Sequence, residues 1–158
     1  MHETGDLLDV AVATVYSPGA VAIDTRGDDV STGAEPERLN QEGFEAFSAR
    51  TGDGTPVVML NLLAFKPDGG QERYMEYAAA VAPLLEKVGG RIVFAGVPAP
   101  PLLGDDSWDM VALVEYPTRQ AFLEMTASPE YQAIGHLRTE ALIKGELHPM
   151  DQADAPTG

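Results

Sequence analysis

Cysteine is absent from this chain of 158 residues. Disulfides, thiolate zinc sites, iron–sulfur clusters and cysteine nucleophiles are therefore excluded together. The absence is compatible with a reducing compartment, and we expect a cytoplasmic protein. Long apolar runs are also missing, and none approaches the roughly 20 residues that a membrane span requires. The first residues, Met1–Asp6, lack the basic region and apolar run of a secretory signal.

Basic residues are few, with 10 Lys and Arg against 25 Asp and Glu and a formal net charge of −15. A field of this sign repels phosphate backbones and anionic lipid surfaces. We therefore expect neither nucleic acid nor a membrane as a partner. The ordinary explanation for so much acidity is a solvated surface that keeps the protein soluble.

The hydrophobic content of 44% is enough for a core, and the length fits one domain with extensions. We place that domain at residues 55–150, after an N-terminal extension (1–54) and before a polar tail (151–158). The extension is predicted to hold a hairpin over residues 10–23, for which a mobile arm is the alternative, followed by a loop. It is then predicted to form a helix over residues 36–50, because Pro36 suits a first helical turn.

The domain itself alternates strand and helix patterns. The predicted strands are 56–65, 91–97, 108–116 and 146–150, and the predicted helices are 74–88 and 118–142. Thr118 and Ser128 are expected to cap two pieces of the second helix, which Lys144 and Gly145 would end. The order β-α-β-β-α-β predicts an α+β fold, a ferredoxin-like sandwich with two helices on one face of a four-stranded antiparallel sheet.

Both faces of the predicted strands are apolar, although a half-exposed antiparallel sheet should alternate apolar and polar residues. In the first strand one face holds Val57, Met59, Leu63 and Phe65, and the other holds Val58, Leu60, Leu62 and Ala64. Two helices cover only one face, and each apolar side chain buried on the other contributes about 1.5–3 kcal/mol. We therefore expect a homodimer that pairs the open faces; the rival cover is the N-terminal extension.

Several linked motifs between residues 55 and 148 resemble a known family. They are Pro56–Phe65, Tyr74 with Tyr77, Ala82–Leu85, Gly89-Gly90, Trp108-Asp109, Glu115–Pro117, Phe122 with Met125, Ser128–Gln132, Arg138 and Leu142. This set is similar to members of domain-of-unknown-function family 1330 (DUF1330). The resemblance implies a dimeric α+β barrel with a pocket between sheet and helices. It implies no settled activity, since the superfamily includes polyketide cyclases, cofactor-free monooxygenases, muconolactone isomerases and haem-degrading enzymes.

Three polar residues are predicted to carry any catalysis. Glu115 lies on the same strand face as Val111 and Leu113, so burial would raise its pKa toward that of a general acid or base. Pairing with Arg91 or Arg138 would make it structural, and a position near the strand end would let it simply reach water. Arg138 shares an apolar helical face with Tyr131, and its partner would be a protein carboxylate or an anionic ligand. Asn61 interrupts an apolar strand and would either orient a ligand carbonyl or bind neighbouring backbone.

Five further residues are predicted to bind a ligand: Tyr74, Tyr77, Trp108, Tyr131 and His136. For Tyr74 and Tyr77 the alternative is aromatic core packing, and Trp108 is expected at the dimer seam or the barrel mouth. His136 and Glu140 lie one helical turn apart, but no His-Glu-x-x-His setting exists, so no metal is expected.

Two functions remain open from the sequence. The first is a cofactor-independent acid–base enzyme acting on a polyketide-like or aromatic carbonyl compound. The second is a non-catalytic homodimer that binds an apolar small molecule or acts as a scaffold. No cofactor is expected in either case.

Overall fold

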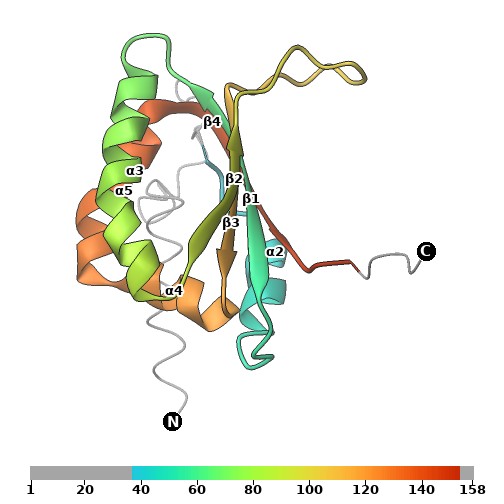
Figure 1. Cartoon of the computed structure of the whole chain (residues 1–158), viewed down its shortest axis with the longest axis vertical. Coiled ribbons are helices and arrows are strands. Elements are labelled where there is room, and N and C mark those ends of the chain that lie inside the picture. The colour runs from blue at the N-terminus through green and yellow to red at the C-terminus, as the bar shows by residue number, and fades with distance from the viewer. Residues whose placement is uncertain (1–36, 154–158) are drawn as a thin grey trace, which may run out of the picture.

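A computed structural model describes residues 37–153. The predicted hairpin, the loop after it, Pro36 and residues 154–158 lie outside this range. The elements, in chain order, are α2 (Gln41–Ser48), β1 (Val57–Phe65), α3 (Gly70–Lys87), β2 (Arg91–Gly96), β3 (Met110–Tyr116), α4 (Arg119–Ala127), α5 (Pro129–Ala141) and β4 (Leu142–Met150). Figure 1 shows them as two layers, with α3 and α5 packed side by side on one face of the sheet.

The four strands form one antiparallel sheet in the order β2-β3-β1-β4. β1 lies in the centre, where Leu60 pairs with Leu113 of β3 on one side and with His148 of β4 on the other. The order and the layers confirm the predicted ferredoxin-like α+β sandwich.

The two faces of β1 differ in burial, as the alternation of a strand requires. Val57, Met59, Asn61 and Leu63 are buried against the helices, and the residues between them are only half-buried. We call the face that holds Val57, Met59, Asn61 and Leu63 the inner face, and the opposite face of the sheet the outer face. The helices α3 and α5 lie on the side opposite the outer face (Figure 1), and α2 sends Phe47 into the core beside Phe122.

Three helices begin at side-chain caps. Asn40 accepts a hydrogen bond from the backbone N–H of Gly43 at 2.9 Å, so α2 begins at Gln41 and not at Pro36 as predicted. Thr118 and Ser128 cap α4 and α5 in the same way, as predicted. Ser128 has an extended backbone and precedes Pro129, and it separates the two helices. Its side chain accepts a hydrogen bond from the backbone N–H of Tyr131 in the first turn of α5.

The end of α5 differs from the prediction. The helix stops at Ala141, and β4 begins at Leu142, so Lys144 and Gly145 are strand residues and do not end a helix. Leu142 is fully buried and pairs with Phe65 of β1. The burial of Leu142 and its pairing with β1 stabilise the strand conformation here more than another turn of α5 would stabilise the helix.

Candidate functional site

A cavity of about 270 Å³ lies between α3 and the inner face of the sheet. Its walls are mostly apolar and include Met59, Val81, Leu85, Met110, Val114 and Phe122. Four of the predicted site residues also line it, namely Asn61, Tyr74, Tyr77 and Arg138. A mostly apolar cavity with a few polar groups is the usual form of a small-molecule site.

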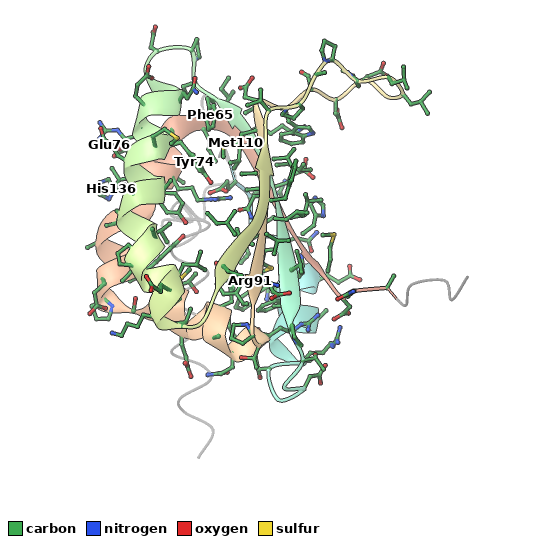
Figure 2. All side chains as sticks on the ribbon, viewed as in Figure 1. Phe65, Tyr74, Glu76, Arg91, Met110 and His136 are labelled. Atoms are coloured by element: carbon green, nitrogen blue, oxygen red, sulfur yellow. The ribbon has the colours of Figure 1, made fainter. Side chains whose placement is uncertain are left out.

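Each polar residue reaches the cavity from a different part of the fold. Asn61 lies in the middle of β1 on its inner face, and Tyr74 and Tyr77 lie one turn apart on α3. Arg138 comes from the last turn of α5. Figure 2 shows Tyr74 between α3 and the sheet, on the side of Phe65 and Met110. The site thus depends on the packing of α3 against α5.

Asn61 is buried, and neighbouring backbone holds its amide group. Its Nδ2 donates to the carbonyl oxygens of Met59 at 3.2 Å and of Ala112 at 3.4 Å. These bonds correspond to the second role considered for Asn61, the binding of neighbouring backbone. They also fix the side chain so that its remaining polar atom is the acceptor Oδ1.

The tyrosines form a connected aromatic group. The Tyr77 and Tyr131 hydroxyls are 2.9 Å apart, and the rings of Tyr74 and Tyr77 have centroids 5.5 Å apart. Burial raises the pKa of the Tyr74 phenol, and the nearby charge of Arg138 opposes this shift. Burial likewise raises the pKa of Tyr77. Both phenols are therefore neutral at neutral pH and can donate hydrogen bonds.

Arg138 makes a buried ion pair that the sequence did not reveal. Its Nε donates to Oε1 of Glu37 at 2.6 Å, and the two residues are only 3% and 6% exposed. The guanidinium carbon lies 5.8 Å from the Tyr77 ring centroid. The sequence required a partner for an arginine on an apolar face, but it could not select one carboxylate among 25.

A second cavity, of about 430 Å³, lies between residues 37–47 and β4. Glu37, Phe44, Phe47 and Gly145 are among its walls, and it shares Met59, Phe122 and Leu147 with the first cavity. Because Glu37 lines one cavity and Arg138 the other, their ion pair lies where the two cavities meet.

Three predicted site residues lie elsewhere. Glu115 is on the outer face, where Arg91 Nε donates to its carboxylate at 3.0 Å, so it is not beside the cavity. Trp108 precedes β3 and lies under Lys144, whose Nζ is 4.4 Å from the ring centroid. His136 is exposed on the side of α5 away from the sheet (Figure 2). Neither Trp108 nor His136 lines either cavity.

The raised phenol pKa values predict how stability depends on pH. A raised pKa means that folding favours the neutral phenols, so this stabilisation is complete below about pH 10, the ordinary tyrosine value, and is lost as pH rises through the higher folded value. In a tyrosinate absorbance titration, at least the phenols of Tyr74 and Tyr77 should ionise only together with unfolding. Tyr77→Phe should remove one of them; if it removes absorbance at an ordinary pKa, the phenol is not shielded as described.

Neither a metal site nor a membrane span is evident in the described part of the chain. Residues 37–153 contain no group of three His, Asp or Glu side chains that could hold a metal ion. None of their helices is long and apolar enough to cross a membrane.

The fold and the inner cavity define a ferredoxin-like α+β protein with a pocket between its two layers. The family model described as Domain of unknown function (DUF1330) matches residues 69–147, half of the chain, a narrower span than the motifs quoted above. The chain belongs to this family, which confirms the resemblance. A comparison with curated proteins finds no match.

Solved structures agree with this assignment. A protein of unknown function from Rhodopseudomonas palustris is 32% identical, with a TM-score of 0.65 over 74% of this chain and 96% of that one. A dimeric ferredoxin-like protein of unknown function from Jannaschia sp. is 14% identical, with a TM-score of 0.52 over 61% of this chain and 99% of that one. A hydroxynitrile lyase from Passiflora edulis is also 14% identical, with a TM-score of 0.50 over 65% and 99%. The last two similarities concern the fold alone.

Proposed function

We propose that the inner cavity binds an apolar small molecule that carries a carbonyl, enol or carboxylate oxygen. The observation that carries this proposal is the meeting of Tyr74, Tyr77 and Arg138, all hydrogen-bond donors, on a cavity with otherwise apolar walls. Apolar walls supply affinity through burial, and a few fixed donors select an oxygen-bearing ligand. A polyketide-like or aromatic carbonyl compound matches both properties.

Two alanine substitutions on α3 test the cavity. Ala78 lines it, whereas its neighbour Ala79 is exposed to solvent. Ala78→Leu should therefore fill part of the binding space and lower the affinity for acetophenone by about tenfold or more, which corresponds to about 1.4 kcal/mol. Calorimetric titration with acetophenone provides the measurement. Ala79→Leu, the same change on the outer side of the helix, should leave the affinity as it is in the wild type.

Two results would contradict these expectations. Equal losses in both variants would mean that the ligand is not bound between α3 and the sheet. No heat of binding in the wild-type chain, for acetophenone and for larger aromatic ketones, would contradict the proposed function itself.

Proton-transfer catalysis of the cyclase, isomerase or monooxygenase type is a second candidate for the same cavity. Neutral phenols and a guanidinium are donors that stabilise the oxygen of an enolate. This arrangement gives Arg138 and Tyr74 the stabilising role and leaves Glu115, on the outer face, outside the chemistry. Any turnover found should therefore fall in Arg138→Gln and persist in Glu115→Gln.

We also propose that the chain forms a homodimer through the outer face, in the cytoplasm. The support is the apolar, half-buried row of Val58, Leu60 and Leu62, together with the dimeric state named for the Jannaschia protein. The connection between β2 and β3 projects toward the same side, away from the helices (Figure 1). It carries Leu102 and Leu103, which are 96% and 90% exposed. A second copy on the outer face would give these side chains an apolar surface to cover.

A further inference from the structure

We infer that Glu37 is an internal stand-in for the anionic group of a ligand, and that the cavity takes a carboxylate anion which displaces Glu37 from Arg138. The inference rests on the proposed function and names its ligand class. It assigns Glu37 a role as a competitor for Arg138, and Gly145 a role in allowing that competitor to dock.

The first argument is the chemistry of Arg138. A guanidinium has a rigid fork of donors that matches a carboxylate, and a buried one requires such a partner. Here Glu37 provides it at 2.6 Å, while the guanidinium lies against the Tyr77 ring and lines the inner cavity. The group that Arg138 already holds is therefore chemically the same as the group it would bind on a ligand.

The second argument is the way Glu37 is held. It belongs to no helix or strand, and α2 begins only at Gln41. Within residues 37–153, the contact with Arg138 is the one hydrogen bond that its side chain makes. Space adjoins it on its own side, because it lines the larger cavity. The carboxylate can therefore leave Arg138 without breaking a hydrogen bond of the sheet or of α2.

The third argument is Gly145 on β4. A Cβ at this position would lie 2.8 Å from both Cγ and Oε1 of Glu37, a distance that real Cβ atoms do not adopt. Glycine weakens a strand, and here it provides the room in which the Glu37 side chain reaches Arg138. Gly145→Ala therefore obstructs docking of Glu37 without changing any charge, although its Cβ would also lie 2.9 Å from Cδ1 of the buried Leu142. Glu37→Gln, which adds no atom near Leu142, is its control.

The ligand class follows from these observations. It is a monoanion whose carboxylate meets Arg138 and whose apolar body occupies the inner cavity of about 270 Å³. Benzoate is the simplest probe of this class, and acetophenone is a neutral aromatic probe of similar size that cannot take the place of the Glu37 charge.

Calorimetric titration of the full chain with benzoate and with acetophenone tests the inference. Glu37→Gln and Gly145→Ala should each raise the affinity for benzoate by about tenfold or more, because the ligand no longer competes with a docked carboxylate. Their affinity for acetophenone should change little. Arg138→Gln combined with Glu37→Gln keeps a neutral pair at the site, and it should abolish the gain for benzoate. Benzoate should also raise the melting temperature of Glu37→Gln more than that of the wild type.

A purely structural ion pair gives a different pattern. Glu37→Gln and Gly145→Ala would then bind benzoate no better than the wild type, although acetophenone still bound, and the inference would be overturned while the proposed function stood. If neither probe bound any of the variants, the proposed function would fail together with the inference. A gain for benzoate that survived the double substitution would exclude Arg138 as its anchor.

Discussion

Tyr131→Ala is expected to lower the free energy of unfolding by about 3–5 kcal/mol, the range for removing a large aromatic side chain from a core. Among residues 37–153, Tyr131 is the largest side chain that is fully buried, with 0% exposure, and its ring packs edge-on against Tyr77 with centroids 6.2 Å apart. Truncation would open a cavity between α5 and α3 and would leave the Tyr77 hydroxyl without the partner 2.9 Å away. Urea unfolding at fixed protein concentration measures the loss.

Tyr131→Phe is the matched control. It keeps the ring and removes only the hydroxyl, so it should cost about 1–3 kcal/mol, the penalty for a buried polar group that loses its partner. The difference between the two variants isolates the packing of the ring. Equal costs would mean that the hydroxyl contact, and not ring burial, holds α3 against α5.

The fold could be predicted because its local signals agree with one another. Residues 57–65 form a short apolar run that Lys66 and Pro67 end, and the lack of alternation in this run predicted a strand with two apolar faces. Ser128 followed by Pro129 predicted the break between α4 and α5, since a cap and a first-turn proline act within a few residues. Signals of this kind need no knowledge of distant parts of the chain.

The transition from α5 to β4 could not be predicted for the opposite reason. Leu142 and Lys144 have helical spacing with the residues before them, but β1 supplies a ladder for them from nearly 80 positions earlier in the sequence. Tertiary pairing of this kind overrides local propensity. The same limit applies to Glu37, which is 101 positions from Arg138 and has no local feature that distinguishes it from the other acidic residues.

The candidate site was predictable to the extent that helical and strand periodicity determines it. Periodicity places Tyr74 with Tyr77 and Tyr131 with Arg138 on common helical faces, and the structure brings these four residues together. Periodicity also places Glu115 with Val111 and Leu113, but it does not say which face of a sheet the helices cover. When both faces are apolar, that choice depends on the path of the connections, and Glu115 lies on the uncovered side.

The largest effect on assembly is expected from Leu60→Asp. Leu60 lies in the middle of the outer face, between Leu113 and His148 on the flanking strands, and its side chain is half-buried in the single protomer. In a two-fold dimer the substitution would bury two unpaired carboxylates, at a cost of several kcal/mol for each. The dissociation constant of the dimer should therefore rise by about 100-fold or more, which corresponds to about 2.7 kcal/mol. The protomer itself should fold, since the outer face is not part of its core.

Sedimentation equilibrium of the full chain across micromolar concentrations measures the change, with circular dichroism as the check on folding. Ala133→Asp adds the same charge to the exposed surface of α5 and should leave the dimer intact. Replacing Leu102 and Leu103 by serine separates the contribution of the projecting connection, because those side chains touch little within their own protomer. A monomeric wild-type chain, or a Leu60→Asp variant that remains as dimeric as Ala133→Asp, would show that the outer face is not where two copies meet.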